Sequence, residues 1–168
     1  MPGFSMNDER SDAFSIANVI LGGGMSSRLF QKIREELGLA YSVYSYGSQY
    51  KDGGVLEVVA GVNTEQRDLA VEAIVSEVRK FKKYGITEQE FLRGKEQIKS
   101  AFIMGRESTS SQMLLYGRYL LFLDTVFDVE KRLKTLHEIT IKDVFDVIDL
   151  SFDIDKASTA TVGNRRSA

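Results

Sequence analysis

Hydrophobic positions in the first part of the chain recur at helical spacing in two consecutive blocks. Over residues 9–21 apolar side chains return every three or four positions, and the glycines at 22–24 end this pattern. A second block follows directly, with Ser26 or Ser27 as its candidate cap, and ends at Gly38. The pattern therefore predicts two helices joined by a glycine-rich turn.

The pattern then becomes that of two β-strands. Residues 40–50 and 55–62 are rich in tyrosine and valine, which are frequent in strands. The short segment between them contains Asp52 followed by Gly53, and this pair is a strong signal for a hairpin turn. We therefore expect an antiparallel hairpin.

Helical spacing returns after the hairpin. Residues 63–66, 87–90 and 140–143 have the form of capping boxes and predict the starts of three amphipathic helices. A further helix is expected over residues 110–123, and residues 156–162 are expected to form a closing strand.

Strands and helices are thus segregated along the chain, which is typical of an α+β fold. We expect a small antiparallel β-sheet covered on one face by several α-helices. The only proline is Pro2, and no linker rich in glycine, serine or proline follows it. Residues 1–168 are therefore interpreted as a single domain with no internal boundary.

Composition narrows the classes of function. The chain is 43% hydrophobic and 27% charged, as soluble domains are, and its net charge of -2 with mixed signs gives no reason to expect a nucleic-acid partner. The most apolar stretch, residues 113–127, is too short and too polar to cross a membrane. The N-terminus does not resemble a secretory signal, so we expect a cytoplasmic location.

A metal site is not expected in this chain. It contains no cysteine, and its only histidine is His137. Because a catalytic zinc ion takes three protein ligands, one imidazole is not enough. We expect His137 to lie on the surface or to be half-buried.

The glycines at 22–24 have two possible roles, phosphate binding or a turn between helices. A glycine pair before a helix can bind phosphate, but here a helix rather than a strand precedes it, Ser27 occupies the third fingerprint position, and no Gly-Lys-Ser/Thr follows. A sharp turn between two helices, with positive φ angles and close backbone approach, explains the glycines better.

The segment from Leu21 to Val43, LGGGMSSRLFQKIREELGLAYSV, carries a family resemblance. It closely resembles part of the C-terminal, non-zinc-binding half of zinc endopeptidases of the pitrilysin and mitochondrial processing peptidase family. The predicted elements on both sides agree, so the resemblance extends from about Gly3 to about Gly163. In this family, two or four similar α+β halves enclose an unfolded peptide, and the zinc-binding half carries a His-x-x-Glu-His motif that is absent here.

The resemblance implies that this chain is the substrate-binding and transition-state-assisting half of a zinc metalloendopeptidase. Zinc would come from a complementary half or a partner chain, and this chain alone would bind no stoichiometric zinc and cleave no peptide. Its first residues resemble the end of a strand, so we expect the half to lack its first strand. The expected partners are the zinc-binding half, an unfolded peptide and further copies of the chain in a homo-oligomer.

By the same resemblance, Arg34 and Tyr41 are the catalytic candidates. A guanidinium and a phenol hydroxyl are suitable donors to the oxygen on which negative charge develops during peptide hydrolysis. The structural alternative is that Arg34 pairs with Glu35, Glu36 or Glu90 while Tyr41 packs in the hairpin. Without the family resemblance, that alternative would be preferred.

Three further residues are substrate-binding candidates. In the family the glycine turn lies near the chamber wall, so Gly23 and Gly24 are included. Tyr44 shares a strand face with Tyr46 and Tyr50, opposite Tyr41, and one of the two faces could offer aromatic surface to a peptide.

The rival hypothesis is a non-catalytic scaffold or interaction subunit of the same family. The presence of both Arg34 and Tyr41 argues against it, because a scaffold has no chemical need for this pair.

Overall fold

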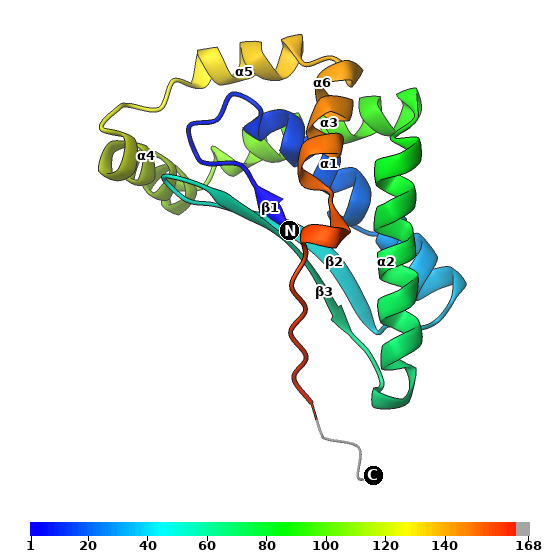
Figure 1. Ribbon diagram of the computed structural model, residues 1–168. Helices are drawn as coiled ribbons and strands as arrows, with labels where there is room; N and C mark the ends of the chain where they lie inside the picture. The colour runs from blue at the N-terminus through cyan, green and yellow to red at the C-terminus, as the bar shows by residue number, and fades with distance from the viewer. Residues whose placement is uncertain (164–168) are drawn as a thin grey trace.

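The predicted hairpin forms the centre of the structure. In the computed structural model, which describes residues 1–163, strands β2 (Ser42–Gln49) and β3 (Gly54–Gly61) pair antiparallel, with Ser42 opposite Gly61 and Gln49 opposite Gly54. The short strand β1 (Pro2–Gly3) pairs with the start of β3, so the strand order is β1-β3-β2. The α+β prediction is confirmed: the sheet is small and antiparallel, and the helices pack on one side of it (Figure 1).

The predicted helices occur in the predicted order, together with a further short helix and two 3-10 turns. They are α1 (Ser11–Gly22), the π-helix η1 (Phe30–Glu36), the 3-10 turn η2 (Thr64–Gln66), α2 (Arg67–Tyr84), α3 (Glu88–Gly105), α4 (Thr109–Leu123), α5 (Val129–Glu138), α6 (Ile141–Ser151) and the 3-10 turn η3 (Ile154–Lys156). None of those within residues 1–163 combines the length and apolar character that a membrane span requires.

Two of the three predicted capping boxes are present. The hydroxyl of Thr87 accepts the backbone N–H of Glu90, and the Glu90 carboxylate accepts the N–H of Thr87; Thr140 and Asp143 repeat this arrangement at α6. The box predicted at residues 63–66 is wrong. The side chain of Asn63 caps nothing, because the chain there first makes the tight turn η2 before α2 begins.

Ser27 does not cap the second helix either. Its hydroxyl donates to the carbonyl of Gly24 at 2.5 Å, inside the preceding turn, instead of accepting a helix N–H. The helix that follows is wound as a π-helix, whose last bond joins the N–H of Leu37 to the carbonyl of Lys32 at 3.1 Å. Helical spacing of apolar residues did not distinguish this winding from an α-helix.

The predicted closing strand is wrong as well. Residues 154–156 form η3, and residues 157–162 form no strand. A strand needs a neighbour to which its backbone can bond, and this segment makes no ladder with β3.

The core lies between α1, the sheet and α6. Phe14 of α1 contacts Phe4 edge-on with ring centres 5.5 Å apart, and it also contacts Phe152, which in turn meets Phe81 at 5.1 Å. In α6, Val144, Val147 and Ile148 are fully buried, whereas Phe145 is partly exposed.

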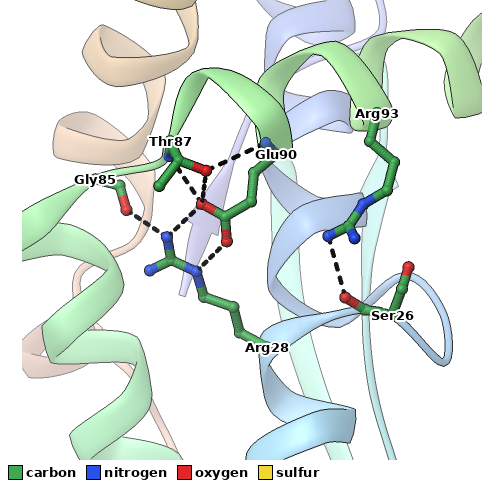
Figure 2. A network of polar contacts seen from close by, with 6 residues as sticks. All are labelled: Ser26, Arg28, Gly85, Thr87, Glu90 and Arg93. Carbon is green, nitrogen blue, oxygen red and sulfur yellow. Dashed lines mark hydrogen bonds and ion pairs between the residues drawn. The ribbon is translucent and has the colours of Figure 1, made fainter.

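An ion pair fixes the start of the second helix to the junction of α2 and α3 (Figure 2). Arg28 donates from Nε and Nη2 to the two carboxylate oxygens of Glu90 at 2.7 and 2.8 Å, and from Nη2 to the carbonyl of Gly85 at 2.8 Å. Its guanidinium lies 5.1 Å from the centre of the Phe81 ring. Burial alone would raise the pKa of Glu90, but the hydrogen bonds from Arg28 and Thr87 outweigh it and lower that pKa to about 2.

The first prediction concerns the contact between α1 and β2. A Cβ atom at Gly47 would overlap the buried ring of Phe14, whereas one at Gly53, in the hairpin turn, would meet nothing within 4 Å. Gly47→Ala should therefore lower the free energy of unfolding by about 1–3 kcal/mol. Gly53→Ala is the matched control and should leave stability nearly unchanged or slightly higher. Urea denaturation measures both, and equal midpoints for the two variants would show that α1 is not tightly seated on β2.

The second prediction concerns the charge on Glu90. Because its pKa is lower in the folded chain than the ordinary value of 4.5, the ion pair stabilises the fold fully above about pH 5 and loses this effect as the pH falls toward 2. Glu90→Gln should cost about 1–2 kcal/mol at pH 7, since solvent weakens a partly exposed pair. The difference from the native chain should shrink steadily below pH 5. Glu88→Gln, an exposed carboxylate in the same turn, is the control; a difference for Glu90→Gln that does not change with pH would contradict the assigned role.

Candidate functional site

The two catalytic candidates are held at one corner of the molecule, where the second helix passes into the hairpin. Gly38 has φ +61, a left-handed conformation that favours glycine, and it turns the chain sharply after η1. The N–H of Leu39 then bonds back to the carbonyl of Ile33 at 2.9 Å, and the N–H of Tyr41 bonds to the carbonyl of Gly61 in β3 at 2.8 Å. The backbone on both sides of the turn is therefore fixed.

Arg34 and Tyr41 lie side by side at this corner. The guanidinium carbon of Arg34 is 5.9 Å from the centre of the Tyr41 ring and 4.8 Å from that of Phe30. Tyr41 is 86% exposed, and the side chain of Arg34 is 43% exposed. Because neither group is enclosed by protein, both can reach a molecule that docks against this corner.

The structural alternative for this pair is only partly observed. Arg34 does approach a carboxylate, that of Glu35, at 3.7 Å, but both side chains are open to solvent. Glu90 is the partner of Arg28, not of Arg34. Tyr41 precedes the first residue of β2, so it does not share the buried side of Val43 and does not pack into the hairpin.

The π-helix contributes directly to this geometry. π-helical turns are rare and are frequent at functional sites. Phe30 and Arg34 stand four residues apart within η1, and the ring of Phe30 contacts the same guanidinium that lies beside Tyr41. The spacing of Phe30 and Arg34 was a local signal that could have identified this contact from the sequence.

Arg28 and Glu90 are supporting residues that the sequence did not reveal. They anchor the beginning of the helix whose end carries Arg34. Near the beginning of the same helix, Arg93 of α3 donates to the carbonyl of Ser26 at 3.3 Å (Figure 2). The arginine and the glutamate are separated by 62 positions, and no local pattern predicts a contact over such a separation.

The glycine candidates lie apart from the catalytic pair. Gly23 has φ -84 as the C-cap of α1, and none of the glycines at 22–24 has a positive φ, so that part of the turn prediction is wrong. Close backbone approach is observed at Gly22, where a Cβ atom would collide with Ser45 of β2. Gly24 faces Gln97 of α3. A Cβ atom at Gly23 would meet Val19 and one at Gly24 would meet Gln97, so neither glycine packs against Arg34 or Tyr41.

Tyr44 lies on the open face of the sheet. It is 46% exposed, and its ring stacks on that of Tyr46 with centres 6.1 Å apart. The hydroxyl of Tyr46 donates to Glu57 across the hairpin at 2.9 Å. On the opposite face, Val43 and Ser45 are buried. The predicted sharing of faces is confirmed for Tyr44 and Tyr46, which provide an exposed aromatic surface.

Within residues 1–163 the donor side chains are not arranged to bind a zinc ion. His137 is exposed near the end of α5, as predicted, and its carbonyl accepts a hydrogen bond from Lys95. Among the residues that the structure describes, no three histidine, cysteine, aspartate or glutamate side chains gather in a group able to hold a metal.

Comparison with known proteins agrees with the resemblance found in the sequence. The family model for the peptidase M16 inactive domain matches residues 1–98. The uncharacterised zinc protease YmxG of Bacillus subtilis is 37% identical over 142 residues, covering 84% of this chain and 35% of that protein. An uncharacterised zinc protease of Streptomyces coelicolor is 38% identical over 144 residues, covering 86% of this chain and 31% of its own length.

The fold agrees as well. The crystal structure of a peptidase M16 inactive domain from Pseudomonas fluorescens superposes with a TM-score of 0.78 at 21% identity, covering 92% of this chain and 37% of that one. The chain spans about a third of the length of the curated relatives that it matches. It therefore belongs to the M16 peptidase family, in which it corresponds to the inactive, C-terminal domain.

Proposed function

We propose that this chain is the substrate-binding and transition-state-assisting half of a zinc metalloendopeptidase that hydrolyses peptides in an enclosed chamber. The zinc would be supplied by a complementary half or a partner chain. The observation that carries this proposal is the position of Arg34 beside Tyr41, both accessible, on a backbone fixed by hydrogen bonds on each side.

The chemistry of the pair suits peptide hydrolysis. Attack on a peptide carbonyl moves negative charge onto its oxygen, and donors that are already in place stabilise that charge more than they stabilise the uncharged substrate. The guanidinium of Arg34 offers a planar set of N–H donors, and the Tyr41 hydroxyl offers one O–H. A scaffold subunit would have no need to expose these groups together.

The names and lengths of the relatives support a zinc-binding partner. Curated relatives that are more than 35% identical carry the name zinc protease, and about two thirds of their length lies outside the match with this chain. Since the present residues do not suit zinc, the proposal assigns the metal to that remaining length or to a separate subunit. The exposed rings of Tyr44 and Tyr46 would then face the bound peptide.

A large apolar surface on α4 supports a covering partner. This helix buries none of its residues, although it is rich in leucine and aromatic side chains. The exposed apolar residues on and just after it are Met113, Leu114, Leu120, Leu121, Phe122 and Val126. Because contiguous apolar surface of this kind usually marks an interface, we propose that α4 is covered by the complementary half, and by a second copy when the chain is alone.

The third prediction tests Arg34 and Tyr41 in the peptidase assembled with its zinc-binding half. Tyr41→Phe keeps the ring and removes only the hydroxyl, so turnover should fall about 10²- to 10³-fold, the usual loss for one oxyanion donor. Arg34→Lys should also lower turnover, because a flexible ammonium cannot replace the planar guanidinium. Steady-state kinetics on a quenched peptide measures both changes.

Tyr84→Phe is the matched control for Tyr41→Phe, since Tyr84 is also exposed but lies at the end of α2. The melting temperature should remain unchanged in all three variants. If Tyr41→Phe and Arg34→Lys kept near-normal turnover while lowering the melting temperature, the pair would be structural and the proposed function would lose its support.

The fourth prediction concerns α4 in the isolated chain. Because its apolar side is uncovered, the chain should self-associate in a concentration-dependent manner. Leu121→Glu should weaken the association about 10- to 100-fold, as expected when one buried leucine is lost. Leu92→Glu, which changes an exposed leucine of α3, is the control and should have little effect. Sedimentation equilibrium measures the association, and a chain that stays monomeric at high concentration would contradict an interface on α4.

A further inference from the structure

Two aromatic rings contact the guanidinium of Arg34. Its central carbon lies over the ring of Phe30, 4.8 Å from the ring centre, and over that of Tyr41, 5.9 Å from the centre. The carboxylate of Glu35 stands 3.7 Å from Nε, which is beyond hydrogen-bonding distance. A ring attracts a cation through the charge distribution of its face. The N–H groups of Arg34 therefore remain able to bond an oxygen of another molecule.

Phe30 is the closer of the two rings and the more firmly held. It is half-buried, whereas Tyr41 is 86% exposed. Phe30 follows Leu29 and precedes Ile33 by less than one turn, and both of these side chains are fully buried. The ion pair between the start of this helix and α3 fixes the same end of the segment (Figure 2). Phe30 therefore supplies the fixed side of the contact with the guanidinium.

Carboxylates next to Arg34 would compete for its donors if the ring were absent. Glu35 is the following residue, and Glu36 comes next and is paired with Lys32. An arginine side chain has many rotamers, and holding one of them on an exposed surface costs conformational entropy. A guanidinium that is not held by a ring is free to turn toward a neighbouring carboxylate, which would occupy the N–H groups.

We propose that Phe30 is a positioning residue for Arg34. Its ring holds the guanidinium beside Tyr41 with the N–H groups free for the substrate, and it keeps the guanidinium from pairing with Glu35. This inference rests on the proposed function, and Phe30 itself does not touch the substrate. Donors stabilise a developing negative charge best when they are already in place. The ring should therefore influence turnover much more than the affinity for uncharged substrate groups.

Steady-state kinetics of the peptidase assembled with its zinc-binding half tests this role. Phe30→Leu should lower kcat about 3- to 30-fold with KM nearly unchanged, as expected for the loss of one cation–π contact. Phe30→Met provides the same comparison with a second apolar side chain. Phe30→Tyr keeps the ring face and should retain kcat to within about twofold. Failure of tyrosine to rescue kcat would overturn the proposal.

Phe102→Leu is the matched control. Phe102 of α3 is also half-buried, and its ring centre also lies 4.8 Å from a guanidinium carbon, that of Arg132. The substitution removes a comparable packing and cation–π contact that does not involve Arg34, so kcat should not change. Equal losses of kcat in Phe102→Leu and Phe30→Leu would show a general effect on stability and would overturn the positioning role.

A double-mutant cycle shows whether Phe30 acts through Arg34. If it does, Phe30→Leu should cause no further loss of kcat once Arg34→Gln has removed the guanidinium, because contacting residues that act as a unit are not additive. Additive losses would contradict the proposal, since the ring would then affect turnover without the arginine.

Nuclear magnetic resonance of the 168-residue chain gives a measurement that needs no activity. Ring currents should shift the Nε–H and Cδ proton resonances of Arg34. In Phe30→Leu these resonances should move toward those of a free arginine, whereas Tyr41→Phe, which keeps both rings, should leave them in place. Unchanged Arg34 resonances in Phe30→Leu would overturn this inference at any level of turnover. Normal turnover in Arg34→Lys would instead refute the proposed function, so the two failures are distinguishable.

Discussion

The close seating of α1 on β2 is the contact on which the rest of the structure depends. Gly22 allows the end of α1 to approach the backbone of Ser45, and Gly47 leaves room for the ring of Phe14. Any larger side chain at these places would separate helix from sheet. The turn after α1 leads into η1, and β2 begins just after Tyr41. The turn after α1 and the backbone bonds of Leu39 and Tyr41 together connect η1 to this helix–strand pair, and so position Arg34.

Elements with strong local signals were predicted well from the sequence. The Asp52-Gly53 turn, and the capping boxes that begin with Thr87 and Thr140, depend on residues within four positions of one another, so the chain reveals them without knowledge of the fold. Residues 156–162 have strand-like composition, but whether a strand forms depends on a neighbour that composition does not supply. The winding of η1 and the pairing of Arg28 with Glu90 likewise depend on distant parts of the chain.

The residues of the candidate site could be predicted from the sequence, but their arrangement in space could not. Arg34 and Tyr41 could be selected only through the family resemblance, because an arginine and a tyrosine seven positions apart have no chemical signature of their own. The alternation of side chains placed Tyr41 on the strand face opposite Tyr44, which is the buried face, yet Tyr41 lies before the strand and is exposed. Close packing of the glycines was predicted correctly and is observed at Gly22, but glycines 22–24 do not have the predicted positive φ angles. Gly22 lies against β2 and Gly24 against α3, not beside the catalytic pair.

The π-helix η1 has a consequence for how this segment can vary in evolution. A π-helical turn holds about one residue more than an α-helical turn, and each residue of an α-helix advances the side-chain direction by about 100°. A deletion between Phe30 and Arg34 that restored α-helical winding would change the angle between these two side chains, and with it the contact between the Phe30 ring and the guanidinium. A substitution that keeps the length of the segment leaves the backbone spacing of the two residues unchanged. The length of the segment is therefore part of the geometry that positions Arg34.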